Sequence, residues 1–208
     1  MRAVMTIKYP AGTRHKNSVQ NTIRTGKTTK KALIFGKRGM GLEDEINEAN
    51  DYYLANLLAV VHKKPTPITI VKVDYPARAA AKITEAYFKQ ASTTDYNGVY
   101  QGRYIDFDAK ETKNKTSFPL KNFHQHQITH LANILSQGGI GFVIIKFTTL
   151  NEGYVYPASA LIKQWQNLKG KQSISYHDIL THGYIIPESL NPSLDYLKAI
   201  DMMLESLK

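Results

Sequence analysis

The chain has 208 residues and a formal net charge of +10, with 27 Lys and Arg against 17 Asp and Glu. Its length suits one domain, and its 42% hydrophobic content and mean hydropathy of -0.35 are typical of a soluble globular protein. The absence of cysteine excludes disulfides, thiolate nucleophiles and cysteine-bound zinc, and no apolar run approaches the roughly 20 residues that cross a bilayer. We therefore expect a cytoplasmic protein with no membrane partner.

The excess positive charge lies at the N-terminus. Residues 1–38 contain ten basic residues and no acid, and they lack periodic apolar residues. This composition predicts a disordered, flexible basic arm over residues 1–32, followed by a single domain over residues 33–208. A polyanion is the natural partner of such an arm. Because the arm has no amphipathic stripe of the kind that lies on lipid, nucleic acid is favoured.

Hydrophobic periodicity predicts the elements of the domain in chain order. Apolar residues at helical spacing predict a helix over 41–61, ended by Pro65 and Pro67, and a β-branched run predicts a strand over 68–73. Residues 74–92 fit neither template and predict an insertion that projects from the core. Further strands are expected over 94–110, 140–147 and 153–156, and further helices over 120–136, 158–168 and 194–207. These elements predict an α/β fold with a mixed sheet flanked by helices.

The segment 94–110 carries candidate chemistry. If Gln101-Gly102 forms a two-residue hairpin turn, Asp95 faces Asp108 across the two strands. Like charges that face each other destabilise a sheet unless something binds between them, and the alternation of side chains places Lys110 on the same face as Asp108. The two carboxylates suit a hard cation such as Mg²⁺, which would polarise a phosphodiester and activate water, and Lys110 would orient that water or stabilise charge in the transition state.

Other interpretations of the same residues stay open. A turn at Asn97-Gly98 would break this register. The three charges also fit a plain cross-strand salt bridge on a solvated face, and Asp106 shares that face as a rival ligand. His126 and His130 have the spacing of a helical zinc pair, but Gln127 stands where zinc enzymes of that type have glutamate, which disfavours zinc.

These residues also carry a resemblance. Asp95, followed thirteen residues later by Asp108-x-Lys110, resembles the PD-(D/E)xK nuclease signature. The surrounding runs closely resemble the RecU family, the Holliday junction resolvases of Gram-positive bacteria, at residues 85–90, 92–98, 102–107 and 110–119. The similarity covers nearly the whole chain and is densest from residue 63 to residue 130. It implies a restriction-endonuclease-like sheet with a projecting stalk at about residues 74–92.

The resemblance also implies an activity. A member of this family is a homodimeric, Mg²⁺-dependent endonuclease, with Mn²⁺ as a substitute metal, that makes paired symmetric nicks in four-way junctions during recombination and repair. By motif, Asp95 and Asp108 are metal carboxylates and Lys110 is the catalytic lysine, with Thr93 and Gln127 completing the metal surroundings. The family usually has Glu at position 108, so this shorter Asp must reach the metal through backbone adjustment or water. A recombinase and a branch-migration motor are the family's partner proteins.

The predicted DNA contacts lie on the stalk and on the loop that follows the site. Cations there are expected to meet phosphates, and aromatic rings to stack on exposed bases, at Arg78, Lys82, Tyr87, Phe88, Lys113 and Lys115. The two aromatic residues also fit a second interpretation, in which they cover the core or a dimer interface. The alternative function is a DNA-bridging, strand-annealing regulator of recombination with weak or no cleavage.

Overall fold

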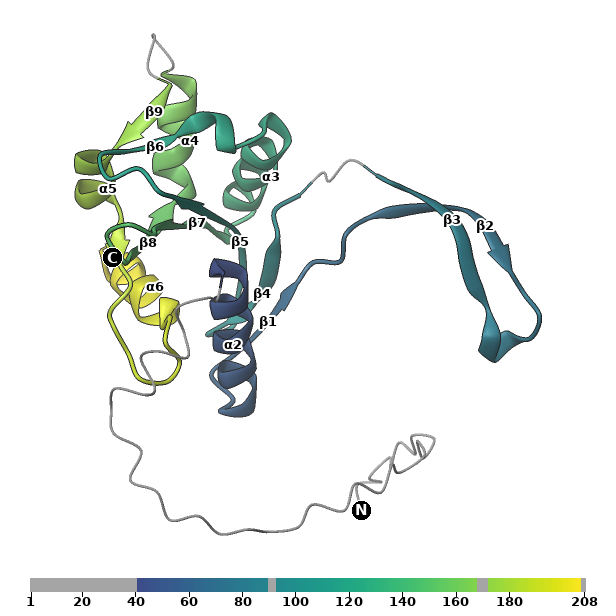
Figure 1. The fold of residues 1–208 in the computed structure, drawn as a ribbon. Coiled ribbons are helices and arrows are strands. Elements are labelled where there is room, and N and C mark those ends of the chain that lie inside the picture. The colour runs from purple at the N-terminus through teal and green to yellow at the C-terminus, as the bar shows by residue number, and fades with distance from the viewer. Residues whose placement is uncertain (1–40, 90–92, 168–171, 207–208) are drawn as a thin grey trace. The chain divides into compact units, whose positions relative to one another are not determined.

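The computed structural model describes residues 41–89, 93–167 and 172–206, so the predicted arm over 1–32 lies outside the described residues. A six-stranded sheet in the order β1-β4-β5-β7-β8-β10 forms the centre of the domain (Figure 1). Its strands are Ala59–Lys63, Tyr96–Tyr100, Arg103–Thr112, Ile140–Phe147, Glu152–Pro157 and Tyr184–Ile185. β5 and β7 run parallel and the other neighbours antiparallel. The predicted mixed sheet is therefore confirmed.

Helices cover both faces of this sheet (Figure 1). Helices α2 (Leu42–Ala55) and α6 (Tyr196–Glu205) contribute to one buried cluster, together with alternate residues of β5 and β7. Helices α3 (Gln125–Ser136), α4 (Ala158–Gln166) and α5 (Tyr176–His182) contribute to a second cluster on the other face, which also contains Phe118 of the short strand β6 (Ser117–Pro119) and Ile174 of its partner β9 (Ser173–Ser175). None of the helices in the described residues is long and apolar enough to cross a membrane.

An aromatic stack fixes the orientation of β5. The ring of Phe107 lies between Tyr96 and Phe142, with centroid separations of 5.0 and 4.7 Å and nearly parallel planes. All three rings are fully buried on the face that α2 and α6 cover. Because side chains alternate along a strand, burial of Phe107 turns Asp106 and Asp108 toward the opposite face.

The first helix is shorter than its apolar spacing predicts. α2 ends at Ala55, Leu57 has a positive φ of 56°, and the chain then enters β1. Val61 is buried and Val60 is half exposed, so this pair alternates as a strand does. The prediction of helix up to residue 61 was wrong because one buried face of a short strand coincides with the helical spacing. Pro65 follows the strand and does not end the helix.

The later elements agree with their predicted positions to within a few residues. β7 spans 140–147 as predicted, β8 contains 153–156, and α4 and α6 lie within the predicted helices over 158–168 and 194–207. The predicted helix over 120–136 is divided into a 3-10 turn, η2 (Leu120–Asn122), and α3. The short elements β6, β9, α5 and β10 were not predicted, and neither was β3, which lies in the segment predicted as an insertion.

Residues 68–88 form a hairpin that is separate from the six-stranded sheet. β2 (Ile68–Asp74) and β3 (Lys82–Phe88) pair antiparallel and are joined through a 3-10 turn, η1 (Arg78–Ala80) (Figure 1). Nearly every residue of both strands is exposed. The predicted strand over 68–73 is confirmed, but it is one leg of this hairpin. The exposed segment therefore begins before residue 74.

Gly98 permits the close approach of β1 and β4. It pairs with Val61, and a Cβ atom at Gly98 would lie 2.1 Å from the carbonyl oxygen of Val60. Gly98→Ala must push the two strands apart, and we expect it to lower the free energy of unfolding by about 2 to 3 kcal/mol in urea denaturation. Gly102→Ala is the control, because it has open space around it and adds only the strain of φ +71°, about 1 kcal/mol. Equal losses in the two variants would contradict this packing argument.

Candidate active site

The turn of the central hairpin has the predicted register. Gln101 and Gly102 both have positive φ, at 49° and 71°, as a two-residue hairpin turn requires. The ladder runs from the pair Tyr100 and Arg103 to the pair Tyr96 and Phe107. The next residues beyond the ladder are Asp95 and Asp108, which therefore face each other. The alternative turn at Asn97-Gly98 was wrong, because both residues lie inside β4.

Lys110 joins the two aspartates into one cluster. Its Nζ lies 2.9 Å from Oδ1 of Asp108 and 3.6 Å from Oδ2 of Asp95. Asp108 is fully buried and also accepts a hydrogen bond from the backbone N–H of Ala109, whereas 37% of the Asp95 side chain is exposed. The cluster thus has a buried carboxylate at its base and a solvent-accessible carboxylate at its mouth.

The two carboxyl groups have opposite pKa shifts. Burial, followed by the adjacent Asp95, raises the pKa of Asp108 to about 7, against the opposing influence of Lys110. Burial also disfavours the charged form of Asp95, but a hydrogen bond donated by the Asp108 carboxyl group and the charge of Lys110 outweigh burial and lower the pKa of Asp95. The pair therefore holds one negative charge readily, whereas a second negative charge, on Asp108, is disfavoured unless a further cation offsets it.

A divalent metal fits the arrangement of these groups. Oδ2 of Asp108 is buried and receives no hydrogen bond from the residues that the structure describes. A hard cation satisfies such an oxygen and also offsets the repulsion between the two carboxylates. Among the described residues, no group of three or more His, Asp or Glu side chains is placed to hold a metal. A metal here would therefore use the two aspartates together with other oxygens, such as water and substrate phosphate.

Asp106, the rival ligand, is already surrounded by donors. Lys64 Nζ and the Tyr104 hydroxyl lie 2.7 and 2.8 Å from its Oδ2, and the Thr94 hydroxyl donates to its Oδ1. The Nε2 atom of His130 is 3.2 Å from Oδ2. Burial alone would raise the pKa of Asp106, but these hydrogen bonds overcome burial and lower it. The structure therefore favours Asp108 over Asp106 as the residue that binds an added cation.

The histidines have separate surroundings. His130 contacts Asp106, whereas the ring of His126 stacks on that of His124 with a centroid separation of 5.4 Å. The side chain of Gln127 is buried and accepts a hydrogen bond from the backbone N–H of His124 at 3.1 Å, which caps α3. Thr93 is half-buried, and its hydroxyl donates to the carbonyl of Thr94. The roles of Thr93 and Gln127 toward a metal stay predictions.

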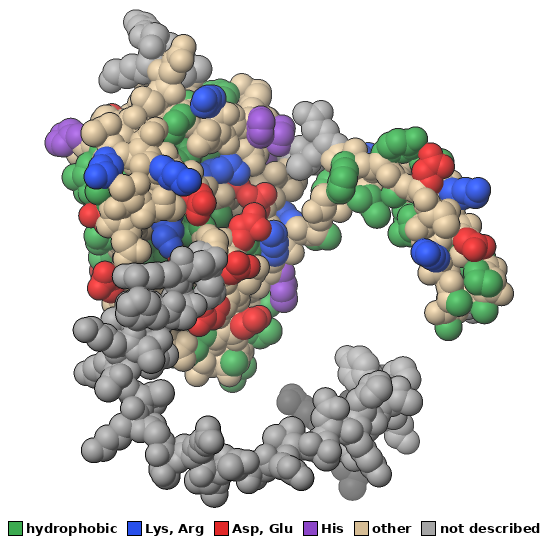
Figure 2. All heavy atoms as spheres, viewed as in Figure 1, with side chains coloured by type: hydrophobic (Ala, Val, Ile, Leu, Met, Phe, Trp, Pro, Cys, Tyr) green, Lys and Arg blue, Asp and Glu red, His purple; other side chains and the backbone are tan. Residues whose placement is uncertain are grey.

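The predicted DNA contacts lie on exposed surface. Tyr87 and Phe88 are 63% and 85% exposed, so within one chain they do not cover the core. Figure 2 shows hydrophobic side chains interspersed with charged ones along this hairpin. Lys82 is also exposed, and the side chain of Arg78 lies outside what the structure describes. Lys113 and Lys115 are exposed in the turn that follows β5. Their contacts with DNA stay predictions.

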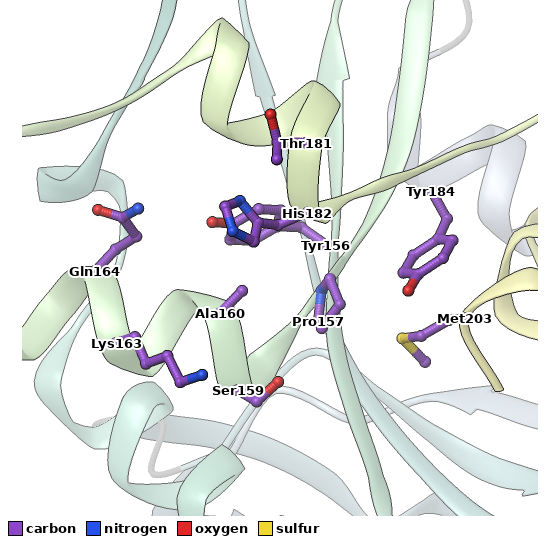
Figure 3. A pocket seen from close by; sticks show the side chains of 10 residues that line it. All are labelled: Tyr156, Pro157, Ser159, Ala160, Lys163, Gln164, Thr181, His182, Tyr184 and Met203. Atoms are coloured by element: carbon purple, nitrogen blue, oxygen red, sulfur yellow. The ribbon is translucent and has the colours of Figure 1, made fainter. Parts of the chain in front are cut away.

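A pocket of about 320 Å³ lies elsewhere in the domain. Figure 3 shows side chains from β8, α4, α5, β10 and α6 around it, including those of Lys163, His182 and Tyr184. The carboxylate cluster is formed instead by β5 and the residue before β4. The pocket and the cluster are therefore built from different elements of the domain.

One protein family and several named proteins match this chain. The family profile described as "RecU: Recombination protein U" matches residues 37–202. A protein named Holliday junction resolvase RecU from Leuconostoc citreum (strain KM20) is 80% identical over 204 residues, which cover 98% of this chain and 100% of that protein. Proteins with the same name from Oenococcus oeni (strain ATCC BAA-331 / PSU-1) and Bacillus cereus (strain B4264) are 59% and 54% identical, over 93% and 96% of this chain and 96% and 98% of those proteins.

The raised pKa of Asp108 predicts a change of stability with pH. The ordinary value is 3.8, so between about pH 4 and 7 the folded protein keeps a proton that the unfolded chain has lost, and stability falls as pH rises through this range. Asp108→Asn removes this effect. In EDTA at about pH 8 we expect its melting temperature to exceed that of the parent by at least about 2 to 4 °C, because each pKa unit corresponds to about 1.4 kcal/mol. The gain should disappear near pH 4, and a variant that is less stable than the parent at pH 8 would refute this electrostatic argument.

Proposed function

The chain belongs to the RecU family, and from this premise we propose that it is an endonuclease that resolves four-way (Holliday) DNA junctions in recombination and repair. The observation that carries the proposal is the buried Asp108, which faces Asp95 and shares Lys110 with it. A buried carboxylate oxygen without a hydrogen-bond partner destabilises the folded protein, and destabilising groups of this kind are typical of catalytic sites. The high identity of the resolvase relatives supports the same conclusion.

Mg²⁺ is the proposed metal, with Mn²⁺ as a substitute. Asp95 and Asp108 would bind it, with Thr93 and Gln127 completing its surroundings. When bound, the metal polarises the phosphodiester and makes water a stronger nucleophile. The fixed ammonium of Lys110 holds the Asp108 carboxylate in place and supplies positive charge beside the position where charge develops on the phosphate. Asp95, whose side chain is 37% exposed, is the carboxylate of the pair that substrate and water can reach.

Junction selectivity is assigned to the exposed hairpin formed by β2 and β3. Lys82 can meet phosphates, while Tyr87 and Phe88 offer rings that stack on bases unpaired at the exchange point. Paired symmetric nicks require two active sites, so we propose that the protein acts as a homodimer. Lys113 and Lys115 lie soon after Lys110 along the chain and would hold the cleaved strand. The recombinase and branch-migration motor remain proposed partners.

A DNA-bridging regulator without cleavage is the weaker alternative. Such a protein needs cations and aromatic rings on its surface, both of which are present. It has no need for a fully buried aspartate with an unpaired oxygen beside a second carboxylate. The arrangement of Asp95, Asp108 and Lys110 therefore favours the enzyme.

The activity is tested with three labelled DNAs, an immobile four-way junction, a Y fork and a plain duplex, each incubated with Mg²⁺. We expect the parent protein to nick the junction in two symmetric strands and to leave the duplex intact. Asp95→Asn, Asp108→Asn and Lys110→Ala should each abolish nicking while the dissociation constant for the junction stays within about threefold, because the basic phosphate contacts remain.

The exposed residue Asp51 on α2 supplies the matched control for this experiment. Asp51→Asn makes the same chemical change away from the cluster and should cleave at the parent rate. Junction cleavage by Asp95→Asn at the parent rate would refute the assigned site. Tight junction binding by the parent with no cleavage in Mg²⁺ or Mn²⁺ would instead favour the bridging regulator.

The hairpin generates a second test, which separates junction recognition from general DNA affinity. The triple variant Arg78→Ala, Lys82→Ala, Phe88→Ala should lose most of its preference for junction over duplex, because each stacked base is worth about 1 to 3 kcal/mol. Its melting temperature should match that of the parent, since Lys82 and Phe88 are exposed. Lys163→Ala, which removes one exposed cation from α4, serves as the charge control. An unchanged preference for junction over duplex in the triple variant would show that the hairpin does not determine junction selectivity.

A further inference from the structure

Lys64 lies at the base of the exposed hairpin and connects three segments of the chain. It follows β1, and Pro65 and Pro67 lead from it into β2. Its backbone N–H donates to the carbonyl of Asp95 at 2.7 Å. Its Nζ donates to the Thr94 hydroxyl at 2.8 Å and to Oδ2 of Asp106 at 2.7 Å. One residue thus binds both the segment that carries Asp95 and the strand that carries Asp108.

These contacts are well shielded from water. The side chain of Lys64 is 17% exposed, Asp106 is fully buried and Thr94 is 2% exposed. Ion pairs on an open surface contribute little, whereas a buried carboxylate with several donors holds its partners in one arrangement. We call the group formed by Lys64, Thr94 and Asp106 the hairpin clasp.

The hairpin clasp acts at the point where Asp95 lacks the support of the regular ladder. β4 begins at Tyr96, so Asp95 lies one residue outside the strand. Thr94 comes directly before it, and the two residues are bound through the side chain and the backbone of Lys64, respectively. Asp108 is held separately, inside β5. The distance between the two carboxylates therefore depends on where the clasp holds the segment 93–95.

We propose that Lys64 is a positioning residue, which holds Asp95 against Asp108 at the separation that a divalent metal requires. The proposal rests on the proposed function, because it takes these two aspartates to be metal-binding groups. In this role Lys64 acts through Thr94 and Asp106, which its ammonium contacts. Lys64 is also the last residue before Pro65-Thr66-Pro67 and β2, so the clasp lies where the exposed hairpin leaves the domain.

We expect Lys64→Met to fold, because the other contacts of Asp106 remain. In Lys64→Met, the long side chain still fills its space, and Asp106 still accepts hydrogen bonds from Thr94 and Tyr104 and keeps its contact with His130. The segment 93–95 loses the side-chain anchor at Thr94. Residues that orient metal ligands typically change metal affinity by about 10- to 100-fold when they are removed, and we expect a loss in this range.

The test compares three variants of the full-length protein. Lys64→Met removes the charge, Lys64→Arg restores a cationic donor, and Lys146→Met is the matched control. Lys146 is also a partly buried lysine in an ion pair, with Glu45 of α2, but that pair packs on the other face of the sheet. Each protein is examined for Mn²⁺ affinity by calorimetry without DNA, for hydrogen exchange at the amides of residues 93–96, and for junction binding in EDTA and cleavage in Mg²⁺.

For Lys64→Met we expect a Mn²⁺ dissociation constant raised about 10-fold or more, faster exchange at residues 93–96, a fall in kcat, and junction binding within about threefold of the parent. Lys64→Arg should recover part of the metal affinity, and Lys146→Met should keep the parent affinity. Unchanged metal affinity and exchange in Lys64→Met would overturn the proposal. If Lys64→Met does not fold, Thr94→Val removes the same anchor and must give the same pattern.

The outcomes distinguish this inference from the proposed function. A parent protein that binds Mn²⁺ but cuts no junction contradicts the resolvase proposal, while the affinities of the Lys64 variants still test the clasp. A parent protein that cuts junctions while Lys64→Met keeps its metal affinity contradicts the clasp alone. Equal losses of Mn²⁺ affinity in Lys64→Met and Lys146→Met would show a general effect of removing a buried ion pair. That result would also overturn the proposed role of Lys64.

Discussion

The register of the β4–β5 hairpin is the constraint on which the candidate site depends. The turn at Gln101 and Gly102 sets the pairing, and burial of the Phe107 ring between Tyr96 and Phe142 prevents a slip by one residue. A one-residue slip would turn Phe107 away from the hydrophobic cluster under α2 and α6 and would turn Asp106 and Asp108 into that cluster. The same aromatic packing that stabilises the sheet therefore brings Asp95 opposite Asp108.

Asp106 and Asp108, two residues apart on β5, are both buried but have different surroundings. Asp106 has donors on both oxygens, and its pKa is lowered in spite of burial. Asp108 is equally buried, but one oxygen has no donor among the described residues and its pKa is raised. The first aspartate is satisfied by the protein and fixes the segments around it. The second is left to be satisfied by a ligand, which is the usual relation between stability and function at an active site.

The sequence predicted the parts of this structure that depend on local patterns. Turn chemistry and side-chain alternation left two turns open for the central hairpin, and the structure has the turn at Gln101-Gly102. The nearly continuous apolar run was enough for β7, because a strand covered on both faces has few polar positions. Spacing alone misplaced the end of α2, since Leu57 and Val61 fit a helix as well as a turn and a strand. The short elements α5 and β10 contain too few residues to show a period.

The surroundings of Asp106 could not be predicted from local patterns. Its contacts come from the end of β1, from the residues before β4 and from α3, which meet only in the folded chain. The assignment of Asp95 and Asp108 as metal ligands is tested most directly by an anomalous difference map from crystals of the protein soaked in Mn²⁺. We expect a peak bonded to the carboxylates of both Asp95 and Asp108, which is absent from crystals of Asp108→Asn. A peak that is bound elsewhere, or a soaked crystal in which Asp108 contacts only Lys110, would contradict it.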